Sequence, residues 1–278
     1  ELKNSVKRFC LDKIEPHMEH DDANSNFRME IFSQLGQLGL TGITLPEEYG
    51  GAGLGYQDLC VVLEEIAKYS VSYSVTVSVS TMVQSILSEF GNEEQKKKYL
   101  PSLTSGEEIG AFCLSESHSG SDAASLKTTA KKVEGGYKLN GSKMWITSGG
   151  IAKTYIVMAR TGVSGPKGVS AFILRDGAEG FSYGKKEVKM GWKISPTREL
   201  VFDNVFIPDE DLLIEEGKGF TVAMSALDRG RITIGAIAVG LAQRALDEAV
   251  KNSLERQQFN QAIFEFQGIQ WMMVDMAT

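Results

Sequence analysis

The chain contains, near its middle, Tyr137-Lys138-Leu139-Asn140-Gly141-Ser142-Lys143-Met144-Trp145-Ile146-Thr147. Asn140-Gly141 is a strong signal for a two-residue turn, because both residue types tolerate the positive φ angles that such turns require. The stretch therefore predicts a β-hairpin. Alternation along its second strand puts Trp145 and Thr147 on one face. An aromatic plane beside a hydroxyl suits a flat heteroaromatic ring; the alternative is a tryptophan packed in the core.

Short, β-branched segments punctuated by glycine continue on both sides of this stretch. Further strands are predicted over residues 155–161, 169–175, 181–188 and 200–207. Six or more short strands at this spacing are typical of a small barrel or sandwich. We place this middle β domain at residues 109–213.

The segments that flank the β domain have helical patterns. Residues 27–40 and 58–67 carry apolar side chains at helical spacing, and Asn92 with Gln95 forms a capping box. Residues 71–80 alternate valine and serine with the period of a strand, but their helical neighbours argue against one. Residues 220–256 contain no proline, and a helix of that length needs neighbours to cover it. The fold class is therefore α+β and multidomain: an N-terminal helical domain (1–108), the β domain, and the start of a C-terminal helical bundle (214–278).

Composition excludes several classes of protein. The 36 acidic residues outnumber the 29 basic ones, which argues against nucleic acid as a partner. No stretch is apolar over the roughly 18 residues of a membrane span, so no membrane insertion is expected. The three scattered cysteines indicate a reducing compartment rather than a disulfide framework. His17 and His20 lack further ligands, and we predict no metal site.

Two other segments are candidates for binding. Residues 112–122 place a predicted strand end before a loop of serine and glycine, which exposes backbone N–H groups to a polar ligand, although most such loops are only loops. Asp228 and Arg231 share one face of the long predicted helix. They form either a surface ion pair or the lining of a groove for a phosphate-bearing ligand, which arginine suits.

Together these motifs, in this order, resemble those of the acyl-CoA dehydrogenase family over essentially the whole chain. The most specific are 114–116 with 120–122, the stretch 139–147, Phe202-Asp203-Asn204-Val205 before Pro208, and 217–220 followed by 227–232. The loop 45–51 also matches. The sequence of residues 227–232 resembles most that of the short-chain, butyryl-CoA dehydrogenase-like members.

The resemblance implies a cofactor, FAD, and roles for particular residues. The residues that it places along FAD are Phe112, Cys113, Leu114, Ser115, Glu116, Ser117, His118, Ser119, Gly120, Ser121, Trp145, Ile146 and Thr147, with Thr147 bonding flavin N5. Ser121 is also implied to touch the acyl-CoA, as are Asp228, Arg229, Gly230 and Arg231. Arg256 and Gln267 match a pair that reaches the FAD of a neighbouring subunit, which implies a homodimer or homotetramer.

The resemblance also implies the activity. An acyl-CoA is oxidised to the trans-2-enoyl-CoA, and electrons pass to an electron-transferring flavoprotein, in a bacterial cytoplasm or a mitochondrial matrix. A carboxylate base is required, and in some members it lies at the position of Gly230, which has no side chain. We therefore expect the base beyond Thr278, and no catalytic residue within this chain.

The chain departs from the family pattern at two places. Glu116-Ser117-His118 stands where the family often has Glu-Pro-Gly, and residues 256–262 lack the usual Gly and Pro. Two alternatives keep the fold but change the function: a flavin-dependent oxidase or monooxygenase, and a non-catalytic CoA- or flavin-binding homologue.

Overall fold

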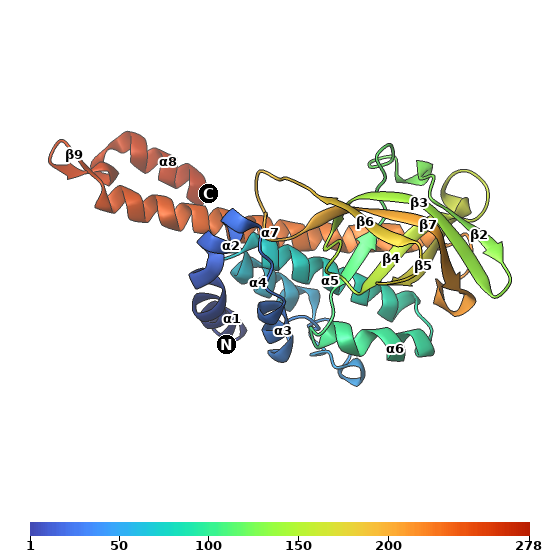
Figure 1. The fold of residues 1–278 in the computed structure, drawn as a ribbon. Coiled ribbons are helices and arrows are strands. Elements are labelled where there is room, and N and C mark those ends of the chain that lie inside the picture. The colour runs from blue at the N-terminus through green and yellow to red at the C-terminus, as the bar shows by residue number, and fades with distance from the viewer.

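The computed structural model describes all 278 residues as a helical part, a β-sheet and one very long helix that runs along both (Figure 1). The N-terminal helices are α1 (Leu2–Phe9), α2 (Met18–Asn24), α3 (Met29–Gln37), α4 (Tyr56–Ala67), α5 (Val71–Phe90) and α6 (Glu93–Thr104). The predicted succession of helical, β and helical segments is confirmed.

Helix α5 forms over the segment whose valines and serines alternate. Most residues from Ser72 to Leu87 are buried, so α5 has no solvent-exposed face along this length. Its sequence therefore shows no helical alternation of apolar and polar residues. Several of the buried hydroxyls have partners: Ser74 donates to the carbonyl of Leu63 and Thr76 to that of Ser72, both at 2.8 Å, whereas Thr81 Oγ1 has none. A central helix tolerates this pattern because most of its polar groups find partners within the core.

The capping box predicted at the start of α6 is present. The Gln95 N–H donates to the Asn92 side chain at 2.8 Å, and the Asn92 N–H donates to the Gln95 side chain at 3.0 Å. The Gln95 amide also donates to the carbonyls of Glu210 and Leu212, at 2.8 and 3.0 Å. One residue therefore caps α6 and ties it to the β domain.

The middle of the chain is one curved, eight-stranded sheet. Its strands are β1 (Gly110–Cys113), β2 (Thr129–Val133), β3 (Gly136–Thr147), β4 (Thr154–Arg160), β5 (Val169–Arg175), β6 (Phe181–Lys186), β7 (Thr197–Pro208) and β8 (Leu212–Leu213). The order is β6-β7-β3-β2-β4-β5-β8, and β1 also pairs with β4. Both β1 and β2 run parallel to β4, at opposite ends of it. The loop 114–128 leaves the sheet at the end of β1 and returns to it at the start of β2.

The hairpin predicted at Asn140-Gly141 is wrong. Strand β3 continues through both residues and pairs with β7 from Gly136 to Thr147, with an irregularity at Gly141. The Asn204 N–H donates to the Asn140 side chain at 2.9 Å, so Asn140 is used across the strands. The hairpin turn lies earlier, between β2 and β3, where Gly135 has φ 73°. Pairing with the long β7 overrides the local preference of Asn-Gly for a turn.

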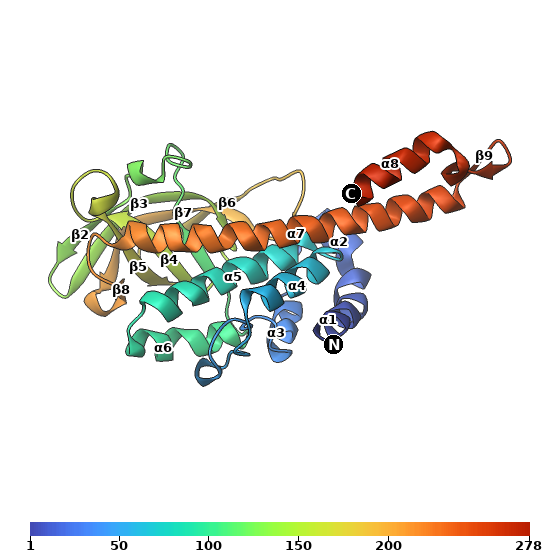
Figure 2. The ribbon, with the colours of Figure 1, turned by 180° about the vertical axis from the view of Figure 1, so that it is seen from behind.

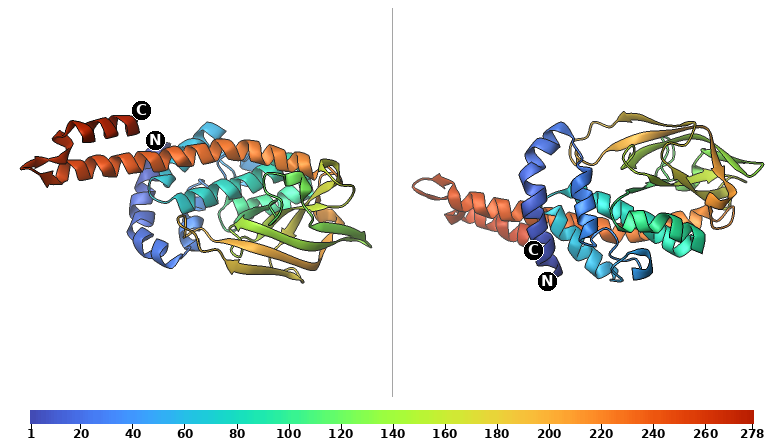
Figure 3. Two further views of the ribbon diagram at one scale, coloured as in Figure 1. Left: turned by 90° about the horizontal axis from the view of Figure 1, so that it is seen from above. Right: turned by 60° about the horizontal axis from the view of Figure 1, so that its bottom comes forward.

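Helix α7 (Gly219–Glu255) crosses the whole molecule and covers α4, α5 and part of the sheet (Figure 2). Beyond it the short strands β9 (Gln257–Gln258) and β10 (Gln261–Ala262) lead into α8 (Gln267–Ala277), which folds back along the projecting end of α7 (Figure 3). One apolar cluster includes Phe32 and Leu63 from the helices and Tyr155 and Phe172 from the sheet. The helices and the sheet are thus held to one another by a continuous core.

No helix combines the length and apolar composition that crossing a membrane requires.

Candidate functional site

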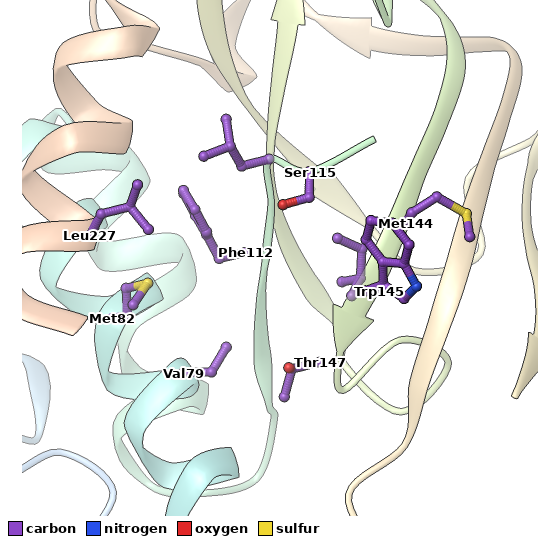
Figure 4. A pocket seen from close by; sticks show the side chains of 10 residues that line it. Val79, Met82, Phe112, Ser115, Met144, Trp145, Thr147 and Leu227 are labelled. Carbon is purple, nitrogen blue, oxygen red and sulfur yellow. The ribbon is translucent and has the colours of Figure 1, made fainter. Parts of the chain in front are cut away.

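A pocket lies where the ends of β1 and β3 meet α5 and α7 (Figure 4). Its lining is mostly apolar, and its residues are Val79, Met82, Phe112, Leu114, Ser115, Met144, Trp145, Ile146, Thr147 and Leu227. Four segments far apart in the sequence therefore form one site: the start of the 112–122 loop, the end of the 137–147 stretch, and one face each of α5 and α7.

A bulge in β3 shapes one wall of the pocket. Lys143 pairs with Leu200, and Ile146 pairs with Arg198. Between these two pairs β3 therefore has one residue more than β7, which makes a bulge. Trp145 lies in the bulge with φ 59°, and 53% of its surface is exposed. Trp145 and Thr147 line the same pocket, as the predicted shared face requires, and the alternative of a core tryptophan is wrong. The bulge lets Trp145, Ile146 and Thr147 all line the pocket.

Two hydroxyl groups lie within the apolar lining. Ser115 Oγ and Thr147 Oγ1 point into the space between the strands and the helices, while Met82 and Leu227 border that space from the helical side (Figure 4). Hydroxyls can donate or accept hydrogen bonds. An apolar cavity with few convergent polar groups fits a flat ring that carries nitrogen and oxygen atoms at its edge.

The loop residues expected along FAD separate into three groups. Phe112, Leu114 and Ser115 line the pocket; Cys113, Glu116 and Ser119 are buried; and Ser117, His118, Gly120 and Ser121 are exposed. Ser119 stabilises the loop itself, because its hydroxyl donates to the carbonyl of Asp122 at 2.7 Å. Burial raises the pKa of the Cys113 thiol, which keeps it protonated.

Glu116 forms a buried ion pair with Lys143 of β3. The carboxylate lies 2.7 Å from Lys143 Nζ, and the side chains are 4% and 0% exposed. Burial by itself would raise the pKa of Glu116, but the ammonium of Lys143 and hydrogen bonds from the N–H groups of Lys127 and Thr128 hold that pKa below its ordinary value. The Glu116 carboxylate is therefore ionised, and its charge opposes the lowering of the Lys143 pKa that burial causes. No sequence signal marks Lys143, because alternation in a strand does not distinguish it from a surface lysine.

The segment Asp228–Arg231 follows Leu227 on α7. Asp228 and Arg231 are exposed and 3.8 Å apart, which is the geometry of a weak surface ion pair. Arg229 pairs with Glu89 of α5. Gly230 lies against Met82, whose Cε would be 2.7 Å from a Cβ at that position. A second, small cavity between α4, α5 and α7 is lined by Arg229, Gly230 and Met82 among others.

Arg256 and Gln267 lie at the projecting end of α7 and α8, and both are exposed (Figure 1). At 1.5 Å per residue, the α7 segment from Leu227 to Arg256 spans roughly 40 Å. The two residues are therefore far from the pocket of their own chain.

Sequence reasoning missed Val79, Met82, Met144 and Leu227, which complete the pocket. Each is an apolar residue whose side chain has no local mark of a site, although Met144 and Leu227 lie within the stretches 139–147 and 227–232. Only the packing of α5 and α7 against the ends of β1 and β3 brings them together.

The chain matches three family models in order along its length. They are the acyl-CoA dehydrogenase N-terminal domain (residues 1–107), middle domain (111–205) and C-terminal domain (217–278). Among curated relatives, the mitochondrial isovaleryl-CoA dehydrogenase of Oryza sativa subsp. japonica is 45% identical over 282 residues, which cover 100% of this chain and 69% of the relative.

Solved structures agree. The butyryl-CoA dehydrogenase of Megasphaera elsdenii superposes with a TM-score of 0.95 at 40% identity, covering 100% of this chain and 75% of that one. An acyl-CoA dehydrogenase from Bacillus anthracis, complexed with FAD, gives 0.92 at 37% identity and covers 99% of this chain and 48% of that one. A chain from the structure of the electron transferring flavoprotein of Acidaminococcus fermentans gives 0.97 at 42%, covering 99% and 73%.

Because three domain models match in order and a relative 45% identical spans the whole chain, the protein belongs to the acyl-CoA dehydrogenase family.

Proposed function

We propose that the protein is an FAD-dependent acyl-CoA dehydrogenase that converts a short-chain acyl-CoA to the trans-2-enoyl-CoA. The observation that carries the proposal is the apolar pocket in which Trp145 presents a half-exposed ring and Ser115 and Thr147 present hydroxyls. When bound, FAD accepts the hydride that leaves the β-carbon of the substrate.

The residues present fit a flavin. Trp145 offers an aromatic surface, and Thr147 offers a hydroxyl that could bond a ring nitrogen such as N5. Ser115, at the start of the loop 114–128, is assigned to the polar edge of the ring. The other loop residues in our assignment, through Ser121, act by backbone groups or by holding the loop in shape.

The helical wall suits the acyl chain. Val79, Met82 and Leu227 give the pocket an apolar face opposite the strands, and we assign Ser121 and the exposed segment Asp228–Arg231 to the CoA portion. A small apolar space favours a short chain, because each methylene that fits contributes about 1–3 kcal/mol of discrimination.

The pocket lining contains no carboxylate. Gly230 has no side chain to act as a base, and Glu116 is held ionised in its pair with Lys143. We therefore assign the base to no residue between Glu1 and Thr278, and its location after Thr278 stays a prediction.

We further propose that Arg256 and Gln267 complete the FAD site of a neighbouring subunit in a homodimer or homotetramer. Their distance from their own pocket supports this, because a residue roughly 40 Å away along α7 cannot reach it. The electron acceptor in this proposal is an electron-transferring flavoprotein, and the compartment is a bacterial cytoplasm or a mitochondrial matrix. The domain boundaries that we propose are 1–108, 109–213 and 214–278.

The test is an anaerobic visible spectrum of the full-length, FAD-loaded protein titrated with butyryl-CoA and then longer acyl-CoAs. Bleaching of the flavin by butyryl-CoA supports the proposal. A flavin that binds butyryl-CoA without bleaching indicates a non-catalytic homologue, and rapid reoxidation of the ligand-bound, reduced flavin by oxygen indicates an oxidase.

The variant Thr147→Val tests whether the Thr147 hydroxyl contributes to FAD binding. Because it replaces only the hydroxyl, we expect FAD to dissociate at least tenfold more readily and the flavin band to shift. Thr129→Val is the matched control, because Thr129 is a half-buried strand threonine outside the pocket. Equal FAD affinity in both variants would remove Thr147 from the site.

A further inference from the structure

A buried ion pair lies directly behind the pocket. Lys143 Nζ donates to the Leu114 carbonyl at 3.0 Å and to Glu116 Oε1 at 2.7 Å. The Glu116 carboxylate accepts two further hydrogen bonds, from the N–H of Lys127 at 2.7 Å and of Thr128 at 3.0 Å. One lysine and one glutamate thus connect β3 to both ends of the loop that leaves the sheet.

The pair adjoins residues that line both sides of the pocket. Leu114 and Ser115 immediately precede Glu116, and Met144 and Trp145 immediately follow Lys143. The Met144 N–H donates to the Ser115 carbonyl at 2.9 Å. Ser115 is therefore held between two groups that Lys143 binds, and its backbone is bonded to the strand that carries Trp145.

Stability alone is a poor explanation for this pair. Taking two charges out of water is costly, and apolar residues of similar volume commonly serve the fold equally well. The loop tip offers little apolar packing of its own, since Ser117, His118, Gly120 and Ser121 are exposed. What the pair provides is a set of directional bonds that give the loop one position relative to β3.

We propose that Glu116 and Lys143 are a positioning pair, which sets the separation between the loop that carries Ser115 and the bulged strand that carries Trp145 and Thr147. The pair touches neither flavin nor substrate; it acts through the residues beside it. The inference rests on the proposed function in taking FAD as the ligand of the pocket.

The test is the double variant Glu116→Gln/Lys143→Met in the full-length protein. The glutamine oxygen still accepts a backbone N–H, and neither charge is left unpaired. The matched control is Glu65→Gln/Lys68→Met at the C-terminal end of α4, which removes another ion pair with a buried carboxylate, 2.9 Å in length, from a site outside the pocket. Three quantities are measured: FAD dissociation by flavin fluorescence, the shape of the bound flavin's visible band, and amide hydrogen exchange over residues 114–128 without FAD.

For the positioning pair we expect FAD binding at least tenfold weaker, a changed flavin band, and exchange over residues 114–128 at least tenfold faster. The control should leave all three within twofold of the wild type. Wild-type values in the Glu116/Lys143 variant, or equal losses in both variants, would overturn the inference.

Two further outcomes are distinguished. If the double variant does not fold, Glu116→Asp alone, which keeps both charges but shortens the carboxylate side chain by one methylene, is measured in the same way, and unchanged loop exchange in it rejects the inference. If the wild type takes up no FAD, the proposed function fails, whereas the exchange measurement still tests whether the pair orders the loop.

Discussion

Replacement of Gly240 by alanine should destabilise the chain, because α7 packs closely against the backbone of α4 there. A Cβ at position 240 would lie 2.2 Å from the Glu64 carbonyl oxygen and 3.0 Å from the Ala67 Cβ. Ordinary contact begins near 3.4 Å, so the two helices must separate by about 1 Å. Overpacking of this kind costs about 1–3 kcal/mol, and the helix-propensity gain of alanine over glycine offsets about 1 kcal/mol of that.

Gly235 provides a matched control on the same helix. It is exposed, and a Cβ there meets nothing within 4 Å. Gly235→Ala should therefore show only the propensity gain, a stabilisation of about 1 kcal/mol. Thermal unfolding followed by circular dichroism measures both variants, and each 1 kcal/mol corresponds to a Tm change of about 2–4 °C. We expect Tm to rise for Gly235→Ala and to fall for Gly240→Ala. Should Gly240→Ala melt at or above Gly235→Ala, the close approach of α4 and α7 at this point is refuted.

Two further predictions concern the helical domain. Burial alone would raise the pKa of Asp21, but hydrogen bonds led by that from Arg28 lower it from 3.8 to about 2. The stability from this ion pair is thus fully present above about pH 4 and is lost as the pH falls towards 2. Asp21→Asn should therefore lower the free energy of unfolding by about 1–2 kcal/mol at pH 6. If the difference in Tm between this variant and the wild type does not shrink between pH 5 and pH 2, the linkage is contradicted. Gln95→Ala should cost about 1–3 kcal/mol in urea unfolding and exceed Asn92→Ala at about 1 kcal/mol, because Gln95 also bonds the carbonyls of Glu210 and Leu212. Equal losses would show that the contacts to the β domain contribute nothing.

The comparison of Asn140-Gly141 with Asn92 shows where sequence reasoning succeeds and fails. The capping box at Asn92 forms as predicted because both of its hydrogen bonds lie within four residues. The Asn140-Gly141 turn does not form, because β7 pairs with β3 on both sides of it. Local signals hold when the partners are local, and they fail when a distant strand supplies more hydrogen bonds than the turn would.

The candidate site divides in the same way. Residue types make candidates of the stretch with Ser115 and the stretch with Trp145 and Thr147, and the family resemblance implies their roles; all three residues line one pocket. Neither route predicted Val79 and Met82, because apolar residues in a helix have the same sequence pattern whether they face a core or a ligand.

The sequence by itself determined the family, the order of helical and β segments, and the two stretches that meet at the pocket, since these depend on residue type, spacing and order along the chain. Only the tertiary structure decided the bulge that turns Trp145 outwards, the burial of Lys143 against Glu116, and the helical wall with Met82. The physical reason is that each of these depends on contacts between segments that are distant in sequence: β7 against β3, the loop against β3, and α5 against the ends of two strands.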